Sequence, residues 1–311
     1  MILLVVGVDG ADYERVLVAE NLPNIRFSRD RDHVRIVSSY PSSMPSWNSM
    51  LTGKPAKQHG MLDMTPEYTS DKIKEKRIWE VEKYRFGVIG VPGLWPPTPI
   101  NGWMITGKLT PSGSIYTYPP ELSSELDRLG YRVDVTVPCE LNDAHIFEGL
   151  DKKAIERELD EIVDPKRTEC LAHLDRTRPV DVCFVVYAAL DWIQHLFMHD
   201  EEKVRWWYKR MDDEVGRLLE ALQPEEKIIV SDHGFTVSPA GRNFTGNHRP
   251  GSILLSSHSI PEILGDVGAV VDLNNPRDWH HITCVFDLMK GILRQRDKTV
   301  ERSLRALGYI N

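Results

Sequence analysis

The sequence predicts an α/β fold in which a mostly parallel central sheet is covered by helices on both faces. Short apolar runs typical of strands alternate along the chain with amphipathic helical patterns, an order characteristic of parallel sheets. The first apolar run, residues 1–8, has no polar interruption, as expected for a strand buried on both faces. A chain of 311 residues with 41% hydrophobic content can bury the core of one such domain.

Each predicted strand is a short apolar run. The expected strands lie near residues 2–8, 34–39, 86–91, 181–187, 227–231, 252–256 and 268–272. The clearest amphipathic helices run from Lys152 to Leu174 and from Glu201 to Leu222, and a last one runs from Ile282 to Leu293. Within the second of these helices, Trp206, Trp207 and Tyr208 are expected to be core anchors.

One long segment departs from this alternation. Between about residues 94 and 150 the pattern loosens into Pro, Gly, Ser and Thr, with one later strand candidate over 131–137. We expect this segment to be a cap or lid inserted in a single catalytic domain that spans residues 1–311, because substrate-contacting parts tend to lie on loops. A purely structural excursion is the alternative. The charge-rich residues 70–76 are predicted to form a solvated helical face.

Acidic and imidazole side chains stand where predicted strands end. Asp9 follows the first strand directly, and Asp232 and His233 follow the apolar run that ends at Val230. Because an open α/β sheet places its ligand crevice at the carboxyl ends of its strands, we interpret these residues as ligands. Each could instead cap a helix or turn, a role that Asp often takes. Their recurrence at several strand ends favours the ligand interpretation.

A second group follows the predicted strand 181–187. Asp191 and His195 are four residues apart, so a helix presents both side chains on one face, where they can bind one cation. An ordinary ion pair on a helix surface is the alternative. His248 lies on a loop just before the strand at 252–256. A site built from Asp191, His195 and His248 leaves a fourth position open, as a catalytic zinc requires.

The candidate nucleophile is Ser43. Pro45 can occupy the first turn of a helix whose exposed amides and positive dipole end face Ser43, which favours an alkoxide or a phosphate at that point. A serine in front of a helix is more often only its N-cap. The other ligand candidates make the catalytic role worth considering.

These segments together resemble the alkaline phosphatase superfamily, in its branch of type I phosphodiesterases and nucleotide pyrophosphatases. The resemblance extends from residue 7 to about residue 257, in the family's order. It rests on Val8-Asp9-Gly10, Ser43-Met-Pro-Ser-Trp47 with Leu51-Thr-Gly53 and His59-Gly60, Asp191-x-x-x-His195, Asp232-His233-Gly234 and His248-Arg-Pro250. The proline-rich segment from Val91 to Gly102 resembles one found in prokaryotic relatives, and we expect it to help wall the site.

The resemblance implies a fold, a cofactor and a mechanism. The fold would be an alkaline-phosphatase-like three-layer α/β/α sandwich with a small cap insertion. Two divalent ions, Zn²⁺ or alternatively Mn²⁺, would be held by two groups of ligands, and a phosphoseryl intermediate would form on Ser43 before water activated on the first metal released phosphate. The implied ligands are Asp191, His195 and His248 for one metal, and Asp9, Asp232 and His233 for the other, with Ser43 beside or bound to the second.

Two departures from the family pattern concern the phosphoryl group. Nucleotide-cleaving members usually have threonine where this chain has Ser43, which keeps the hydroxyl. They also carry an asparagine that donates to the phosphoryl group, where this chain offers Asp63 and Met64. Since such a donor is worth several kcal/mol in the transition state, we expect a substitute, with Asn48 and the backbone amide after Ser43 as candidates.

Sulfatases share the superfamily, and their signature resembles the segment around Ser43 in four positions. Trp47 replaces the sulfatase arginine, and Ser43 is not the cysteine that becomes formylglycine, so sulfate esters are not the expected substrates. We therefore expect a metal-dependent phosphodiesterase or nucleotide pyrophosphatase acting on a small phosphate ester or nucleotide-like substrate. A phosphomonoesterase, a phosphonate hydrolase, a phosphomutase or an inactive metal- or phosphate-binding homologue are the alternatives.

The composition limits the kinds of partner and the location that we expect for the protein. A net charge of −8 argues against a basic nucleic-acid-binding surface. The four widely spaced cysteines predict neither a disulfide framework nor a zinc knuckle. The amino terminus has no basic region before its short apolar run, and no stretch reaches the length of a membrane span, so we expect no membrane association and a cytoplasmic location. The oligomeric state stays open. The remaining histidines, His59, His199, His258, His280 and His281, are expected to be structural.

Overall fold

A computed structural model describes residues 1–18, 21–27, 33–37, 41–65, 69–136, 150–238, 245–264, 280–307 and 309–310. Within these residues, one sheet of nine strands runs through the molecule in the order β11-β2-β10-β7-β1-β6-β3-β4-β5. From edge to edge the strands are β11 (His280–His281), β2 (His33–Val37), β10 (Ser252–Ser256), β7 (Glu226–Val230), β1 (Leu3–Val8), β6 (Val182–Tyr187), β3 (Phe86–Val91), β4 (Gly102–Thr106) and β5 (Thr117–Tyr118).

The centre of the sheet is parallel. Val6 of β1 pairs with Val185 of β6 on one side and with Ile229 of β7 on the other, and β3 and β4 continue the parallel order. Only β10 and β5 run antiparallel to their described neighbours. Parallel strands end at the same edge of a sheet, so the residues that follow β1, β6 and β7 are brought together there.

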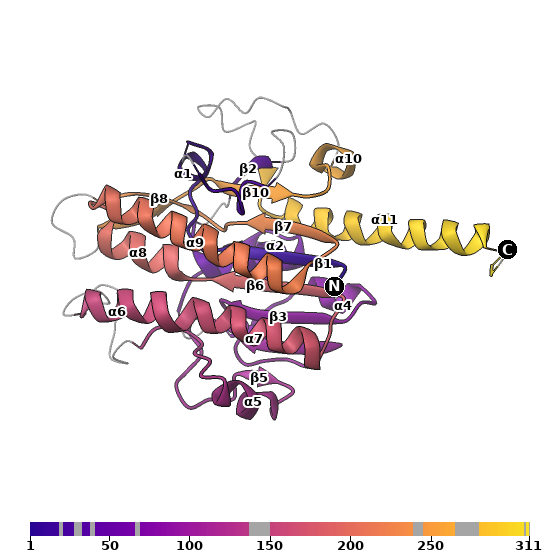
Figure 1. Cartoon of the computed structure of the whole chain (residues 1–311), viewed down its shortest axis with the longest axis horizontal. Coiled ribbons are helices and arrows are strands. Elements are labelled where there is room, and N and C mark those ends of the chain that lie inside the picture. Colours follow the sequence, from indigo (N-terminus) through magenta and orange to yellow (C-terminus); the bar gives the residue numbers. More distant parts are fainter. Residues whose placement is uncertain are drawn as a thin grey trace.

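Helices cover both faces, and Figure 1 shows α6, α7, α8 and α9 lying across one of them. The described α-helices are α1 (Tyr13–Val18), α2 (Ser43–Thr52), α3 (Ala56–His59), α4 (Ile78–Val81), α5 (Leu122–Arg128), α6 (Lys152–Glu158), α7 (Asp164–Thr177), α8 (Ala189–Phe197), α9 (Glu201–Leu222), α10 (Ile260–Leu264) and α11 (Cys284–Ala306). A single π-helical turn, Leu159–Val163, joins α6 to α7.

The alternation of side chains along each strand divides the apolar core in two. Leu4 and Val6 of β1 join the core beneath α7, α8 and α9. Leu3 and Val5 face the opposite core, which contains Trp47 of α2 and residues of α4 and α11. The predicted three-layer α/β/α architecture is thereby confirmed.

A separate two-stranded sheet lies beside the carboxyl ends of the central strands. It consists of β8 (Gly234–Val237) and β9 (Gly246–Arg249), which run antiparallel and pair Phe235 with His248. β9 packs against α8. This arrangement places His248 on a strand rather than on the loop that the sequence predicts.

Most expected strands are found within one or two residues of the predicted bounds, and the candidate at 268–272 lies outside the described residues. The strand predicted at 131–137 is wrong for residues 131–136, which form no strand. There, the backbone N–H of Thr136 donates to the side chain of Glu158 instead of pairing with a neighbouring strand.

Two further predictions need correction. Trp206 is 52% exposed whereas Trp207 and Tyr208 are buried, because successive residues on a helix point in different directions and cannot all face one core. In the segment 70–76, Asp71, Lys72, Lys74 and Lys76 are exposed as predicted, but only Ser70–Lys72 forms a helical turn, of 3₁₀ type, and Ser70 is buried. Its backbone N–H donates to the carbonyl of Trp95, which ties this turn to the proline-rich segment.

Part of the expected cap belongs to the sheet itself. Residues 94–136 contribute β4, β5 and α5, and β4 pairs with β3 over Phe86 to Val91. The residues 137–149 lie outside the described part of the chain. The sequence pattern concealed β4 because it has only five residues and stands among prolines and glycines.

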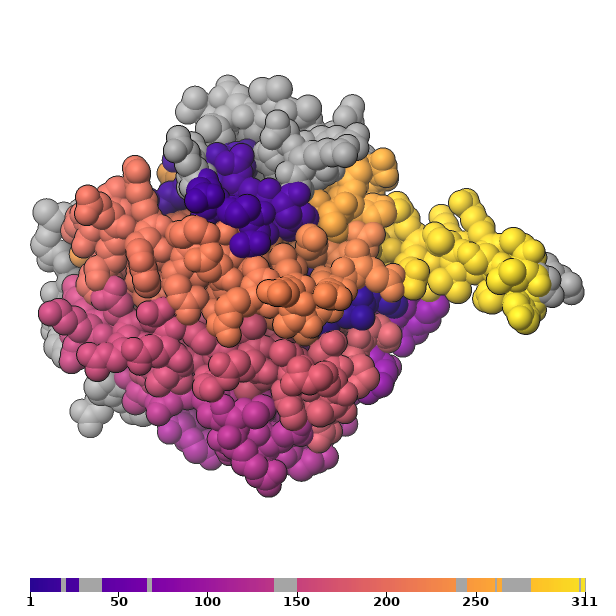
Figure 2. Space-filling model, in the orientation of Figure 1, coloured from indigo at the N-terminus to yellow at the C-terminus, as the bar shows by residue number. Residues whose placement is uncertain are grey.

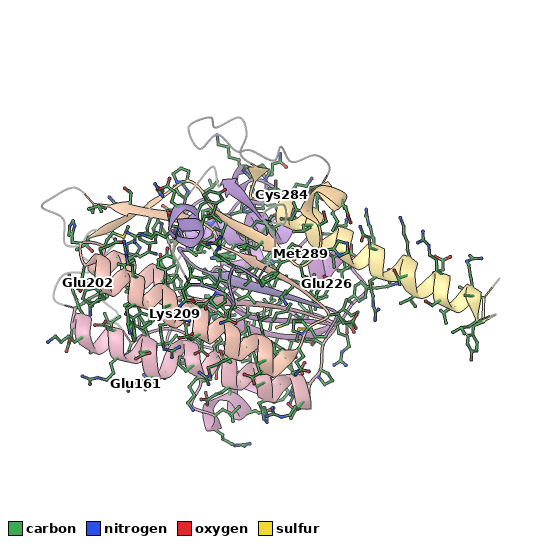
Figure 3. The ribbon with its side chains drawn as sticks, turned by 45° about the horizontal axis from the view of Figure 1, so that its top comes forward. Glu161, Glu202, Lys209, Glu226, Cys284 and Met289 are labelled. Carbon is green, nitrogen blue, oxygen red and sulfur yellow. The ribbon has the colours of Figure 1, made fainter. Side chains whose placement is uncertain are left out.

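The last helix is longer than predicted. Cys284 and Met289 mark the part of α11 that lies against the body in Figure 3, and the helix then extends beyond the body, as Figures 1 and 2 show. Val300 and Leu304 on this extension are exposed. The described helices include none that is both long enough and apolar enough to cross a membrane. Cys170, Cys183 and Cys284 are free thiols, and Cys139 lies outside the described residues.

Candidate active site

The predicted ligands converge at the carboxyl ends of three adjacent strands. Asp9 follows β1 and Asp232 follows β7, and the backbone N–H of Gly10 donates to Asp232 Oδ1 at 3.1 Å. Asp191 lies in the first turn of α8, which follows β6. The parallel order of these strands therefore brings Asp9 next to Asp191 and Asp232, which lie 182 and 223 residues further along the sequence.

Asp191, His195 and His248 form a first cluster of three possible metal ligands. His248 Nε2 lies 3.1 Å from Asp191 Oδ1 and 2.9 Å from His195 Nε2. His195 Nε2 lies 3.5 Å from the same Asp191 oxygen. One nitrogen or oxygen atom of each side chain therefore lies within 3.5 Å of the other two, so that the three atoms could bind one cation.

Backbone carbonyls fix the tautomers of this cluster. His195 Nδ1 lies 3.0 Å from the carbonyl of Gly246, and His248 Nδ1 lies 3.0 Å from that of Pro41. A carbonyl only accepts, so each Nδ1 carries the proton and each Nε2 presents a lone pair. Two lone pairs at 2.9 Å repel unless a cation lies between them, so this geometry fits a metal ion.

Asp9, Asp232 and His233 form a second cluster, and all three side chains are fully buried. His233 Nε2 lies 3.2 Å from Asp232 Oδ2 and 3.4 Å from Asp9 Oδ1. Asp9 Oδ2 and Asp232 Oδ2 are buried and accept no hydrogen bond within the described structure. Buried carboxylate oxygens without donors are costly, and a bound cation would satisfy them.

The electrostatics of the second cluster agree with this need for positive charge. Burial raises the pKa of Asp9 well above its usual value, and repulsion from Asp232 and Asp191 adds to the effect. Burial also raises the pKa of Asp232 to about 7. Burial lowers the pKa of His233 well below its usual value, which keeps the imidazole neutral and able to bind a cation. The donor set of carboxylates and imidazoles suits Zn²⁺ or Mn²⁺.

The two clusters are adjacent. The rings of His233 and His248 stack with centroids 3.7 Å apart, and His233 Nε2 lies 3.9 Å from Asp191 Oδ1. Cations held by the two groups would be close enough to act on one phosphoryl group.

Ser43 is the first residue of α2 and reaches the second cluster. Its Oγ donates to Asp9 Oδ1 at 3.3 Å and lies 3.4 Å from His233 Nε2. The side chain of Ser42, the residue before it, makes no capping hydrogen bond. The hydroxyl of Ser43 is thus aimed at the ligands rather than at the helix backbone.

The residues considered as substitutes for the family asparagine, which donates a hydrogen bond to the phosphoryl group, are less well placed than Ser43. The Nδ2 of Asn48 already donates to the carbonyl of Met44 at 2.8 Å, and the side chain is fully buried, with Oδ1 unpartnered among the described residues. Asp63 is exposed, and its carboxylate accepts from the backbone N–H of Met64 at 2.7 Å. The carbonyl of Pro92 lies 3.5 Å from Asn48 Nδ2, so the proline-rich segment packs on the helix that carries Ser43.

Lys108 is a site residue that sequence reasoning missed. Its Nζ donates to Asp191 Oδ2 and lies 5.1 Å from the centre of the Trp192 ring. Burial opposes its charge, but Asp191 and Asp9 outweigh burial and raise the pKa of Lys108. Lys108 lies two residues after the apolar run Trp103–Thr106, but this short run among prolines and glycines was not predicted as a strand, so the lysine was not placed at a strand end.

Arg249 and Asp12 support the site from outside. Arg249 donates to both carboxylate oxygens of Asp12, each at 2.8 Å, and the backbone N–H of Phe235 donates to Asp12 Oδ2 at 3.1 Å. Asp12 thereby joins the β8–β9 hairpin to the turn after β1. Of the histidines expected to be structural, His59 is buried and its Nε2 lies 3.0 Å from Ser49 Oγ on α2.

Solved structures of known proteins resemble this fold. The murine ectonucleotide pyrophosphatase/phosphodiesterase 5 matches with a TM-score of 0.50 and 14% identity over 77% of this chain and 59% of its own. It has also been solved as an inactive variant in complex with AMP. A phosphonoacetate hydrolase from Sinorhizobium meliloti 1021 matches with a TM-score of 0.47 and 14% identity over 76% of this chain and 57% of its own.

The chain therefore spans about three fifths of the length of these proteins. Among curated proteins, none matches the sequence. The sequence profile of the type I phosphodiesterase / nucleotide pyrophosphatase family matches residues 3–249, which include both clusters and Ser43. The chain belongs to the type I phosphodiesterase / nucleotide pyrophosphatase family.

Proposed function

We propose that this protein is a metal-dependent hydrolase of phosphate esters, of the phosphodiesterase and nucleotide pyrophosphatase type, with Ser43 as its nucleophile. One observation carries the proposal. The Ser43 hydroxyl, at the start of α2, lies 3.3 Å from Asp9 Oδ1 and 3.4 Å from His233 Nε2, beside six converging acidic and imidazole ligands. A nucleophile next to two cation sites is the arrangement that in-line phosphoryl transfer requires.

Each residue has a defined part in the proposed reaction. Bound divalent cations would neutralise the phosphoryl oxygens and lower the pKa of an adjacent hydroxyl. Ser43 Oγ, which donates to Asp9 Oδ1 before the reaction, forms a bond to phosphorus as the bond to the leaving oxygen breaks, and the Ser43 proton reaches the leaving oxygen through solvent. Water then attacks the phosphoseryl group, the bond between Ser43 Oγ and phosphorus breaks, phosphate or a phosphomonoester leaves, and one proton of the water passes to Ser43 Oγ. His195 and His248 keep their Nδ1 protons on backbone carbonyls throughout.

The proposed cofactors are two Zn²⁺ ions, with Mn²⁺ as the alternative, because the ligands are carboxylates and neutral imidazoles. The proposed substrate is a small diester or a nucleotide-like compound. Family membership and the AMP complex of the murine relative support this class. The expected cap, residues 94–150, is proposed to set substrate specificity. A cytoplasmic location stays a prediction.

The test is hydrolysis by purified protein loaded with Zn²⁺ or Mn²⁺. We expect the protein to hydrolyse bis-p-nitrophenyl phosphate, p-nitrophenyl phosphate or a phenylphosphonate ester. The relative rates of hydrolysis of the three compounds then show whether the protein is a phosphodiesterase, a phosphomonoesterase or a phosphonate hydrolase. Ser43→Ala should lower kcat by at least about a thousandfold while the metal content stays close to two per chain. Ser42→Ala is the matched control, since the Ser42 side chain makes no capping hydrogen bond.

Two results would contradict the proposal. Turnover that survives Ser43→Ala would exclude the covalent step. Metal binding without hydrolysis of any of the three compounds would favour the inactive metal- or phosphate-binding homologue, an alternative that the missing family asparagine supports.

A further inference from the structure

A buried lysine approaches the site from the segment expected to form a cap. Lys108 lies two residues beyond β4, its side chain is only 11% exposed, and its ammonium group donates to Asp191 Oδ2. Asp191 Oδ1, the other oxygen, faces His248 and His195. The two oxygens are therefore divided between the metal ligands and the lysine, and Lys108 adjoins the first cluster without occupying it.

The ammonium group of Lys108 has more N–H donors than it uses within the described structure. A lysine carries three N–H donors, and within the described part of the chain Asp191 is the one hydrogen-bond acceptor of Lys108 Nζ. Trp192 contributes only its ring face, 5.1 Å away. The remaining N–H groups can donate to water or to an acceptor that enters the site, and a charged phosphoryl oxygen is a stronger acceptor than water.

The backbone holds Lys108 in place. A Cβ atom on Gly107 would lie 2.2 Å from the carbonyl oxygen of Gly90, so only glycine lets the turn after β4 press against the end of β3. Thr110 Oγ1 donates to the carbonyl of Gly107 at 2.6 Å and closes the turn. Lys108 is thus fixed before any ligand binds, as an electrostatic contact to a transition state requires.

We propose that Lys108 binds a non-bridging oxygen of the phosphoryl group and takes the place of the missing family asparagine. This inference rests on the proposed function and adds a contact to its substrate. The carboxylates of Asp9, Asp191 and Asp232 nearly neutralise two divalent cations, leaving one formal positive charge, and Lys108 adds a second. Lys108 should therefore contribute more to the binding of a phosphoryl group with two negative charges, as in a phosphomonoester or a phosphonate, than to the binding of the singly charged diester of the proposed function.

The experiment compares Lys108→Met with Lys83→Met in metal-loaded protein. The control makes the same kinds of contact at an exposed position, because Lys83 pairs with Asp297 at 2.9 Å and lies over the Tyr84 ring at 5.5 Å, while its side chain is 70% exposed. Lys83 precedes β3 and therefore lies at the opposite end of the strand from the site. Binding of inorganic phosphate is measured by calorimetry at pH 8, and binding of Zn²⁺ by competition with a chelator.

We expect Lys108→Met to weaken phosphate binding at least about tenfold, the value of one charge-assisted hydrogen bond. Zn²⁺ binding should stay the same or tighten, because a neighbouring positive charge is removed. Lys108→Arg should retain phosphate binding within about threefold, and Lys83→Met should change neither affinity. In turnover, Lys108→Met should lower kcat/KM for p-nitrophenyl phosphate about tenfold more than for bis-p-nitrophenyl phosphate.

Two outcomes would overturn the inference. Unchanged phosphate affinity in Lys108→Met would exclude the contact. A parallel loss of Zn²⁺ affinity would assign Lys108 to positioning Asp191 instead. If the wild-type protein hydrolyses nothing but Lys108→Met still loses phosphate affinity, the proposed hydrolase function fails while the role of Lys108 stands.

Discussion

Arg249 forms a bidentate ion pair with Asp12, with both hydrogen bonds at 2.8 Å. Asp12 lies three residues after Asp9, and Arg249 follows His248 directly. The pair therefore ties a ligand of the first cluster to the turn that carries a ligand of the second. Such outer contacts orient metal ligands, and their loss commonly weakens metal binding.

Arg249→Ala should accordingly raise the dissociation constant for Zn²⁺ by about 10- to 100-fold, as measured by chelator competition. Arg15→Ala is the control, since Arg15 also donates two hydrogen bonds to one carboxylate, that of Glu201, and neither residue belongs to the two clusters of possible metal ligands. That change should alter stability by no more than about 1 kcal/mol and leave metal binding intact. Wild-type Zn²⁺ affinity in Arg249→Ala would show that Asp12 does not position His248.

The turn after β1 depends on Gly10. Its φ of +77° is left-handed, and a Cβ atom there would lie 2.7 Å from the ring of Phe235. Gly10→Ala should therefore lower the free energy of unfolding by about 3 kcal/mol or more, through backbone strain and overpacking together. Denaturant unfolding measures this loss.

Gly113→Ala separates the effect of backbone strain from the effect of overpacking. Gly113 has a similar φ of +74°, but a Cβ atom there would meet nothing within 4 Å. We expect a loss of only about 1 kcal/mol from strain alone. Equal losses in the two variants would mean that the contact with Phe235 does not constrain the turn.

Removal of the metals should expose the repulsion among the buried carboxylates. Burial raises the pKa of Asp232 to about 7, above its ordinary value of 3.8, so the stability linked to this group is lost as pH rises through about 7. Unfolded histidines are half protonated at pH 6.5 and lose their remaining protons by pH 8, so their opposite effect is removed by comparison with Asp232→Asn. Relative to Asp232→Asn, the chelated wild-type protein should therefore lose stability towards denaturant between pH 6.5 and pH 8.

Asp232→Asn removes one of these charges. In chelator, this variant should be more stable than the wild-type protein at pH 8, whereas with Zn²⁺ the wild-type protein should be the more stable one. A chelated wild-type protein that gains stability relative to Asp232→Asn between pH 6.5 and pH 8 would contradict the cluster electrostatics.

Acid should destabilise the protein through His59. Burial lowers the pKa of His59 to about 4, below its ordinary value of 6.5. A lowered histidine pKa contributes stability that is present above pH 6.5 and is lost as pH falls towards 4, by up to about 3 kcal/mol. Unfolding measured at pH 7 and at pH 4.5 should show this loss in the wild-type protein and a smaller one in His59→Asn.

Asparagine suits this comparison because it can accept from the backbone N–H of Met61, as His59 Nδ1 does at 3.2 Å. His199→Asn, on the exposed connection between α8 and α9, serves as the control and should keep the wild-type acid sensitivity. The same acid sensitivity in His59→Asn would assign it to other groups.

The sequence alone predicted most of the sheet and the six candidate ligands, together with Ser43, that the structure brings close to one another. Both follow from local pattern: the buried run Leu3–Val8 has no polar residue, and Asp9 stands at its end. Parallel strands share one carboxyl edge, so residues that follow strands can be placed together without coordinates. The strand expected at 131–137 is wrong for residues 131–136, where the backbone N–H of Thr136 donates to the Glu158 side chain, a contact that local pattern cannot foresee.

Only the tertiary structure decided which groups complete the site. Lys108 and Asp191 are 83 residues apart, and their contact depends on β4 joining the sheet beside β3. The tautomers of His195 and His248 depend on carbonyls supplied by other segments, and the amide of Asn48 proved to be engaged by its own helix. Such contacts between distant segments arise from packing and charge in three dimensions, for which a single sequence carries no periodic signal.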